Sequence, residues 1–247
     1  MRSIWEIPGK VLNLFCLGLA VLWSALCALF SLPLYWIKED YGQRTHTLFG
    51  KGWLAIMGIK LEVINPQNLP KMGVLAPNHE SMFDIPVLSS LPTHFRWISK
   101  KEVKRIPFIG WSMQAMGCYF VARDRSGKDL NILKAVEDDL RLGNCVLIFP
   151  EGTRTRTGAL LPFKKGAFKT AQNAGVPLVP IAITGTRSIA PPGKLPSRKH
   201  RVLVRVGNPI IISPGESLDK VMESFRATLT ELLKENRLAL NAGPPGA

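Results

Sequence analysis

An uncharged stretch of 27 residues near the amino terminus, from Val11 to Ile37, constrains this chain more than any other feature of its sequence. About 20 apolar residues are enough for a helix to cross the hydrocarbon core of a bilayer, so the stretch can span a membrane or dip deeply into it. It also contains amphipathic rings suited to the lipid headgroup region, namely Trp23, Tyr35 and Trp36. We therefore expect a membrane-associated helical segment at the amino terminus.

A cleaved signal peptide is the alternative interpretation of this segment. Arg2 precedes the stretch, and residues 25–28 (ALCA) loosely resemble a cleavage site. The apolar core of a signal peptide is usually about 7–15 residues long, however, and this stretch is much longer. We therefore expect a retained anchor.

The charges that flank the stretch indicate its orientation. Two basic residues precede it, Arg2 and Lys10, and four follow it in residues 38–60. Because positively charged flanks favour the cytoplasmic side, we expect the main part of the chain in the cytoplasm, attached to a bacterial-type inner membrane.

The remainder of the chain is strongly basic. The net charge of the 247 residues is +14, and residues 101–205 account for +12 of it. This part of the molecule is expected to face an anionic partner: a phosphate, a membrane surface, a nucleic acid or an acidic protein. The four cysteines show no C-x-x-C spacing, which argues against a disulfide scaffold or a zinc site and favours a reducing compartment.

Short apolar runs alternate with helical patterns along the rest of the chain. Runs rich in Val and Ile and bounded by Gly or Pro, as buried strands are, occupy residues 61–64, 74–76, 96–98, 119–122, 145–149, 178–183 and 202–206. Helical patterns of apolar residues occupy residues 128–142, 163–174 and 217–235. This alternation predicts an α/β fold with a largely parallel sheet covered by helices.

The length of the chain favours a single folded domain behind the anchor. We place the membrane-anchoring helical segment at residues 1–50 and the α/β domain at residues 51–247. Within the second part, residues 241–247 are expected to form a disordered tail.

A first polar cluster, Asn78 to Asp84 (NHESMFD), directly follows the apolar run at 74–76. His79 and Asp84 are five residues apart, so on one helix they would point about 140° apart. They can meet only if His79 lies in a loop and Asp84 lies in the first turn of the next helix. The alternative is a capping box formed by Ser81 and Asp84, in which Asp84 only accepts backbone N–H groups and His79 is a solvated loop residue.

Two further polar clusters follow other predicted strands. Residues 149–158 (FPEGTRTRTG) place a carboxylate, two arginines, two glycines and three hydroxyls within ten residues. Basic residues also follow the third and fourth predicted strands, at 100–102 and 123–125. Sheets of this type bind ligands beyond the carboxyl ends of their strands, so the three clusters can meet on one rim. Arginine suits bidentate contact with phosphate, and a solvated polar surface is the alternative.

In their order and spacing these clusters resemble the four sequence blocks of the glycerophospholipid acyltransferase family, particularly the 1-acyl-glycerol-3-phosphate acyltransferases. Asn78-His79-x4-Asp84 is similar to the first block, and residues 117–123 (GCYFVAR) are similar to the second. Residues 149–154 (FPEGTR) resemble the third block and residues 176–181 (VPLVPI) the fourth. The resemblance therefore covers residues 78–181.

The resemblance implies transfer of a fatty acyl group from a thioester to the free sn-2 hydroxyl of 1-acyl-glycerol-3-phosphate, which gives phosphatidic acid in phospholipid biosynthesis. His79 would act as the general base on that hydroxyl. Asp84 would fix the tautomer of the imidazole and stabilise the imidazolium. Lys100, Arg123 and Arg154 would hold the phosphate of the acceptor.

Other expectations concern the loop, the donor and the partners. Asn78, Glu151 and Gly152 are expected to order the loop or contact the substrate, with backbone N–H groups near Gly152 as candidate donors to the oxyanion. The family implies no cofactor, and the sequence shows no metal-ligand spacing. The expected partners are lysophosphatidic acid, the membrane surface and a donor that is either acyl-coenzyme A or acyl-carrier protein, since the basic stretch 151–205 suits both polyanions.

Other functions fit part of the sequence. An acyltransferase acting on glycerol-3-phosphate or on another lysophospholipid would share all four blocks. A lipid hydrolase would share the base but would use water as the acceptor. A membrane-tethered nucleic-acid binder would explain the charge, but the basic stretch 187–205 has no interleaved aromatic residues, so we expect no nucleic-acid partner.

Overall fold

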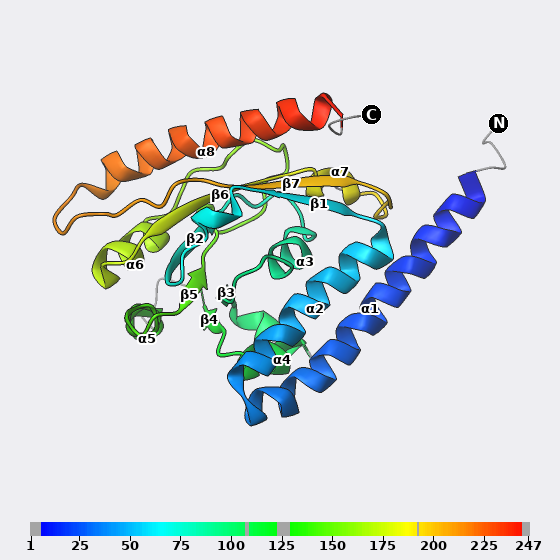
Figure 1. Ribbon diagram of the computed structural model, residues 1–247, viewed down its shortest axis with the longest axis horizontal. Coiled ribbons are helices and arrows are strands. Elements are labelled where there is room, and N and C mark those ends of the chain that lie inside the picture. Colours follow the sequence, from blue (N-terminus) through cyan, green and yellow to red (C-terminus); the bar gives the residue numbers. More distant parts are fainter. Residues whose placement is uncertain (1–5, 107–108, 123–128, 192, 244–247) are drawn as a thin grey trace.

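The chain folds around a seven-stranded sheet with the strand order β1-β7-β6-β2-β5-β3-β4 (Figure 1). The computed structural model describes residues 6–106, 109–122, 129–191 and 193–243. Neighbouring strands are parallel except for β6 and β7, which are antiparallel. The strands are β1 (Lys60–Ile64), β2 (Gly73–Pro77), β3 (Arg96–Lys100), β4 (Tyr119–Val121), β5 (Cys145–Leu147), β6 (Leu178–Thr184) and β7 (Arg201–Val206). The largely parallel sheet and all seven predicted strands are thus confirmed.

Helices cover this sheet on both faces (Figure 1). They are α1 (Glu6–Ile37), α2 (Glu39–Met57), α3 (Asp84–Ser89), α4 (Ile109–Ala115), α5 (Asp129–Arg141), α6 (Gly166–Ala174), α7 (Thr186–Ile189) and α8 (Leu218–Asn241), with short 3-10 turns η1 (Pro66–Asn68) and η2 (Lys101–Arg105). The three helices predicted from apolar patterns correspond to α5, α6 and α8. Because α8 continues to Asn241, the first residue of the expected tail is helical, and residues 244–247 lie outside the described residues.

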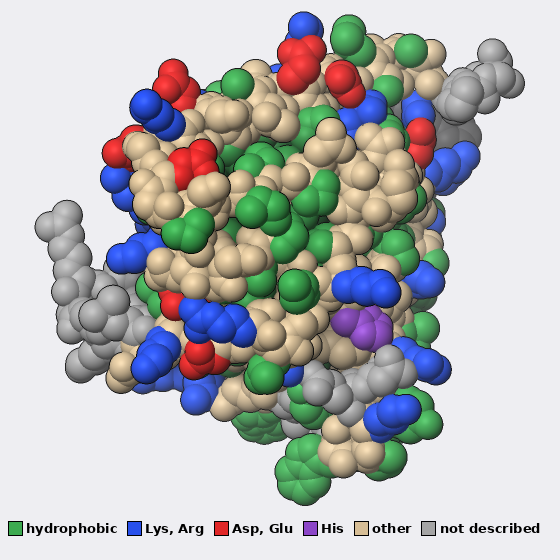
Figure 2. All heavy atoms as spheres, turned by 60° about the vertical axis from the view of Figure 1, so that its left-hand side comes forward, with side chains coloured by type: hydrophobic (Ala, Val, Ile, Leu, Met, Phe, Trp, Pro, Cys, Tyr) green, Lys and Arg blue, Asp and Glu red, His purple; other side chains and the backbone are tan. Residues whose placement is uncertain are grey.

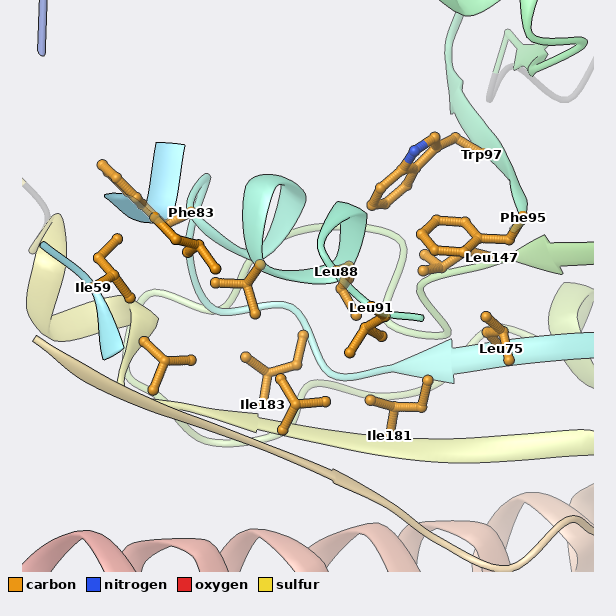
Figure 3. Close-up of a cluster of buried hydrophobic side chains, with 14 of the residues drawn as sticks. Ile59, Leu75, Phe83, Leu88, Leu91, Phe95, Trp97, Leu147, Ile181 and Ile183 are labelled. Carbon is orange, nitrogen blue, oxygen red and sulfur yellow. The ribbon is translucent and has the colours of Figure 1, made fainter. Parts of the chain in front are cut away.

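The alternation of side chains along the strands creates two apolar cores. On one face, Leu75, Leu147 and Ile181 of the sheet form one apolar cluster with Leu88 of α3 and with Phe83, which directly precedes α3 (Figure 3). Burying side chains of this size stabilises the fold by about 1.5–3 kcal/mol each. This core therefore fixes α3 on the sheet, directly above the carboxyl end of β2.

The opposite face of the sheet packs against α5, α6 and α8. Val74, Ala76 and Val146 alternate with the residues of the first core and contact Phe168 of α6 and Phe225 of α8. The rings of Phe168 and Phe225 meet edge to face, with their centroids 5.2 Å apart. The sheet is therefore the middle of three layers, as expected for a buried parallel sheet.

The sequence pattern places residues 39–50 in the helical segment 1–50 but does not predict α2 as a separate helix, which lies between α1 and the sheet. Its three glycines lower the intrinsic preference for a helix and obscure the apolar pattern. In the structure these glycines allow close packing: Gly42 and Gly52 lie against Tyr35 and Trp23 of α1, and Gly50 lies against the backbone of α3. The expected boundary between residues 50 and 51 therefore falls inside a helix that contacts both the anchor and the domain.

α1 forms the outermost element on this side of the molecule (Figure 1). It is joined to α2 by hydrogen bonds from Trp23 Nε1 to the Leu48 carbonyl (3.3 Å) and from Trp53 Nε1 to Ser24 Oγ (2.8 Å). Residues 9–37 are long and apolar enough to cross a membrane, and only 28% of their most apolar window is buried. Such a helix indicates membrane association. The large side chains that it exposes include Val11, Leu12, Leu14, Phe15, Leu19, Val21, Leu22, Leu26, Leu29 and Phe30.

Charged side chains are distributed unevenly over the surface. Figure 2 shows acidic side chains gathered mainly over α8 at the top, while Lys and Arg side chains are scattered over the whole face. Exposed acidic residues of α8 are Asp219, Glu223, Glu231 and Glu235. α8 also carries four basic residues, so it has no net charge, and its Asp219 and Glu235 form ion pairs with Lys165 and Arg205 of the basic stretch.

We predict that Gly50→Ala destabilises the fold, because an added Cβ would lie 2.5 Å from the Pro86 carbonyl oxygen and 2.6 Å from the Ser90 amide nitrogen. Overpacking of this kind usually costs about 1–3 kcal/mol, so the melting temperature should fall. Gly18→Ala is the matched control, since a Cβ on that helical glycine would meet nothing within 4 Å. Equal melting temperatures for the two variants would contradict the close approach of α2 to α3.

Candidate active site

The polar clusters predicted from the sequence lie at one edge of the sheet. β2 pairs in parallel with β5 and β6, and β5 pairs in parallel with β3, so the carboxyl ends of these strands lie together. Asn78 directly follows β2, Phe149 follows β5, Lys100 ends β3, and Thr186 follows β6 after one glycine. Side chains from segments far apart in the sequence therefore meet at this edge.

His79 and Asp84 form a hydrogen-bonded pair, with 2.8 Å between His79 Nδ1 and Asp84 Oδ2. His79 lies in the loop after β2, and Asp84 is the first residue of α3, as the spacing requires. The side chain of Asp84 is fully buried, whereas 15% of the His79 side chain is exposed. Because Nδ1 contacts the carboxylate, Nε2 is the nitrogen that remains to take a proton.

Asp84 also binds the backbone of the loop that precedes α3. Its Oδ2 accepts the backbone N–H groups of Glu80 (2.8 Å) and Ser81 (3.0 Å), and Ser81 Oγ accepts the N–H of Phe83 (3.2 Å). Its Oδ1 accepts the hydroxyl of Thr186 at 2.5 Å. The contact of Asp84 with the Ser81 amide, which a capping box would contain, thus occurs together with the histidine–aspartate pair, although the residue before α3, Phe83, has no side-chain cap.

An aromatic stack supports the imidazole ring from behind. The rings of His79 and Phe149 are nearly parallel, with centroids 3.9 Å apart, and Phe149 in turn stacks on Trp97 at 6.1 Å. Trp97 Nε1 donates a hydrogen bond of 2.8 Å to His46 Nε2 on α2. Burial, with a smaller contribution from His94, lowers the pKa of His46 to about 4, so this ring stays neutral and accepts that bond.

Glu151 holds the loop after β5 to the loop after β2. Its Oε1 accepts the backbone N–H of His79 and its Oε2 accepts that of Leu161, both at 2.8 Å. The backbone N–H of Thr155 then donates to the His79 carbonyl at 2.9 Å. Burial raises the pKa of the Glu151 carboxyl, and the two amide donors oppose this rise. These contacts support loop ordering, one of the two roles expected for Glu151.

Asn78 joins the end of β2 to β6. Its Nδ2 donates to the Ile183 carbonyl at 3.0 Å, and its Oδ1 accepts the Ile183 N–H at 2.7 Å. The side chain is buried and both of its polar ends are used, so Asn78 orders the loop that carries His79.

The amide of Gly152 is already used within its own turn. It donates to the Phe149 carbonyl at 3.0 Å, so this particular N–H is not free to bind an oxyanion. The backbone of Gly152 has φ of 68°, in the left-handed region that favours glycine, and a Cβ there would lie 3.0 Å from Lys164 Cε. Gly152 therefore shapes the loop, and an oxyanion requires other donors.

The three basic residues expected to bind phosphate have different positions. Arg154 is exposed and directly precedes Thr155, whose N–H contacts His79. Lys100 is exposed at the carboxyl end of β3, on the same edge, but no hydrogen bond or ion pair given by the structure joins it to the histidine–aspartate pair. Arg123 lies outside the described residues.

Sequence reasoning missed Glu80 and Thr186. Thr186 Oγ1 lies 3.1 Å from Glu80 Oε1 as well as 2.5 Å from Asp84 Oδ1. Burial, followed by the charge of Asp84, raises the pKa of Glu80 to about 7. Thr186 comes shortly after the predicted strand at 178–183, so the strand-end rule that singled out the other clusters also applies to it.

This arrangement can take a proton from a bound hydroxyl group. Among the hydrogen bonds of the described ranges, none uses His79 Nε2, and the ring edge is partly exposed. The carboxylate behind the ring stabilises the imidazolium that forms when Nε2 takes a proton. Within the same ranges, no three His, Cys, Asp or Glu side chains gather as metal ligands would.

A solved structure resembles this fold. The crystal structure of the 1-acyl-sn-glycerophosphate (LPA) acyltransferase from Thermotoga maritima matches with a TM-score of 0.80 at 22% sequence identity, covering 94% of this chain and 98% of that chain. At this identity the likeness shows the fold, including the helices that cover the largely parallel sheet.

The sequence also has closer relatives. A chloroplastic 1-acyl-sn-glycerol-3-phosphate acyltransferase of Brassica napus is 33% identical over 226 residues, covering 88% of this chain and 65% of the relative. The 1-acyl-sn-glycerol-3-phosphate acyltransferase of Saccharomyces cerevisiae is 32% identical, covering 72% of this chain and 62% of the relative. The chain thus spans slightly less than two thirds of the length of these relatives.

A family model confirms the resemblance seen in the sequence blocks. The family described as "Acyltransferase" matches residues 60–184, about half of the chain, and this range contains the histidine–aspartate pair, Glu151 and the end of β6. Together with the relatives in plants and yeast, this match shows that the chain belongs to the acyltransferase family.

Proposed function

We propose that the protein transfers a fatty acyl group from an acyl thioester to the free sn-2 hydroxyl of 1-acyl-glycerol-3-phosphate, forming phosphatidic acid for phospholipid synthesis. The observation that carries this proposal is the His79–Asp84 pair, in which the carboxylate is buried and Nε2 makes no hydrogen bond to the described part of the chain. Relatives that bear the name of this activity support the choice of acceptor. An acyltransferase acting on glycerol-3-phosphate or on another lysophospholipid is the second candidate within the same chemistry.

The reaction uses the substrate hydroxyl as the nucleophile. As the hydroxyl oxygen attacks the thioester carbonyl carbon, His79 Nε2 takes its proton, and Asp84 stabilises the resulting imidazolium. When the carbon–sulfur bond breaks, the imidazolium returns the proton to the departing thiolate. Ser81 is buried, and its hydroxyl accepts the N–H of Phe83, so its position suits a helix cap rather than an acyl-enzyme nucleophile.

The phosphate of the acceptor supplies the binding energy that orients the hydroxyl. Arg154 is the first choice for this contact, because it is exposed and lies one residue from the loop amide that contacts His79. We assign Lys100 and Arg123 to the same phosphate on the basis of the family resemblance. Holding the phosphate places the neighbouring glycerol hydroxyl near Nε2, so it affects the chemical step as well as binding.

The basic surface indicates the class of acyl donor, and α1 indicates where the protein is located. The donor is acyl-coenzyme A or acyl-carrier protein, both of which are polyanions attracted by the basic surface. We propose no cofactor. α1 inserts into a bacterial-type inner membrane, and the greater number of basic residues after α1 supports a cytoplasmic position for the catalytic residues.

We predict that His79→Ala lowers kcat by about 10²–10⁴, because it removes the base. Asp84→Asn should also lower kcat, because an amide cannot fix the same tautomer. The measurement is acyl transfer from both donors to lysophosphatidic acid, with the melting temperature as a check of folding. The control is His94→Ala, which removes an exposed histidine from another part of the molecule. A folded His79→Ala protein with wild-type turnover would eliminate this mechanism.

We predict that Arg154→Ala lowers kcat/KM for lysophosphatidic acid by roughly 10²-fold, because the acceptor loses its position relative to Nε2. Transfer to a monoacylglycerol, which has no phosphate, should change much less. Arg154→Lys should restore only part of the preference, because an ammonium group cannot make the planar two-pronged contact. Lys194→Ala, which removes another exposed cation, is the control. Unchanged preference for the phosphorylated acceptor in Arg154→Ala would remove Arg154 from the phosphate site.

We predict that Leu22→Glu weakens binding of the full chain to phospholipid vesicles by at least about tenfold, because an ionised side chain in an apolar helix opposes insertion by roughly 2–3 kcal/mol. Leu22 is 57% exposed on α1. Leu142→Glu is the matched control, since Leu142 is 81% exposed just beyond α5. Vesicle flotation after detergent removal measures the membrane binding of both variants. If the two variants float as the wild type does, α1 is not the lipid contact.

A further inference from the structure

Two carboxyl groups share one hydroxyl group beside the catalytic pair. Thr186 Oγ1 lies 2.5 Å from Asp84 Oδ1 and 3.1 Å from Glu80 Oε1. A threonine hydroxyl carries a single hydrogen, so it can donate to only one of these oxygens at a time. The shorter distance assigns that hydrogen to Asp84. The contact between Glu80 and Thr186 is then a hydrogen bond only when Glu80 itself carries a proton and donates it to Thr186 Oγ1.

The other donors around the two carboxyl groups support this assignment. Asp84 accepts three further hydrogen bonds, from His79 Nδ1 and from the backbone N–H groups of Glu80 and Ser81, all on Oδ2. A carboxylate with this many donors keeps its charge. Within the described ranges, Glu80 accepts the backbone N–H groups of Gly185 and Arg187 besides its contact with Thr186. Glu80 is therefore the member of the pair that takes up a proton.

The charged groups that face Glu80 come from its own loop and from α3 and α7. Asp84 of α3 repels a negative charge on Glu80, and burial penalises that charge more strongly still. His79 precedes Glu80 in the loop, and Glu151 is bound on the other side of the His79 amide. Arg187 of α7 contributes its backbone N–H, while its side chain extends toward Gly158. Burial and the charge of Asp84 outweigh the hydrogen bonds from Thr186, Arg187 and Gly185, which lower the pKa, so the pKa of Glu80 rises to about 7.

We propose that Glu80 is a positioning residue, which holds Asp84 in place through Thr186 when its carboxyl is protonated and loosens the His79–Asp84 pair when it is ionised. This inference rests on the proposed acyl transfer. In the protonated form, Glu80 donates to Thr186 and Thr186 donates to Asp84, so every oxygen has a partner. In the ionised form, two carboxylates compete for one hydroxyl hydrogen and repel each other, and turnover falls as the pH rises through 7.

Glu80→Gln tests this proposal, because the amide N–H₂ can donate to Thr186 Oγ1 at every pH while the amide oxygen accepts the Gly185 and Arg187 N–H groups. The variant thus imitates protonated Glu80. The ratio of kcat for Glu80→Gln to kcat for the wild type should rise about three- to tenfold between about pH 6 and pH 8, as expected for one group with a pKa near 7. Glu223→Gln, on the exposed face of α8, is the control and should give a constant ratio.

A second measurement detects the proton on Glu80 without any substrate. The pKa of Glu80 is about 7 in the folded protein against an ordinary value of 4.5, so the folded state binds more protons than the unfolded state between these values. The stability contribution of protonated Glu80 is fully present below about pH 4.5 and is lost as the pH rises to about 7. The melting temperature of Glu80→Gln relative to the wild type should therefore rise across this range and then level off.

Thr186→Val and Thr186→Ser distinguish a relay through the hydroxyl from a direct effect of the charge. In the Thr186→Val background, Glu80→Gln should no longer change the pH dependence of kcat, whereas in the Thr186→Ser background the change should remain.

A kcat ratio of Glu80→Gln to wild type that is constant at all pH values, with or without a uniform loss of activity, would overturn the proposal. A flat difference in melting temperature would also overturn it. If the wild type transfers no acyl group but the melting temperatures show the expected pH dependence, the proposed function is wrong and the protonation of Glu80 stands.

Discussion

The buried charge of Asp84 is the interaction on which the rest of the active site depends. A carboxylate with no exposed surface is tolerated only when donors replace the water it has lost. Here the donors are an imidazole, two backbone amides and a hydroxyl, which come from the loop after β2 and from α7. Displacing either segment would leave the charge without a partner. The loop after β2, α3 and α7 are therefore bound to one another through a single side chain.

The strands of the sheet hold the loop that carries His79 in place. Asn78 binds both polar groups of Ile183, which fixes the end of β2 to β6. Glu151 binds the His79 amide from the side of β5. The backbone around His79 is thus held from both neighbouring strands, so the base is placed by the sheet and not only by the rotamer of its own side chain. This explains why a loop residue can serve as a well-positioned base.

Local patterns in the sequence were sufficient for much of this fold. Short apolar runs predicted all seven strands, and the five-residue spacing of His79 and Asp84 left one geometry in which they can meet, which the structure shows. α2 was not predicted as a separate helix because its glycines favour a helix only through their close packing against α1 and α3. Thr186 lies just after a predicted strand, but its contact with Asp84 spans 102 residues, and no local pattern predicts such a contact. The features that the sequence did not reveal are therefore those that depend on packing between segments distant in the chain.

α1 is connected to the His79–Asp84 pair through packed side chains of α2 and Phe83. Trp53 of α2 donates a hydrogen bond to Ser24 of α1, and its ring packs edge to face on Phe83, with centroids 5.5 Å apart. Phe83 is fully buried and directly precedes Asp84. With α1 inserted in a membrane as proposed, its depth therefore sets the height of the base above the lipid. The proposed acceptor, a lysophospholipid, is also held at a defined depth by its acyl chain, so a base at a matching height would reach its hydroxyl within the leaflet. A flexible linker after α1 would lose this match, and the short, packed junction between α1 and α2 preserves it.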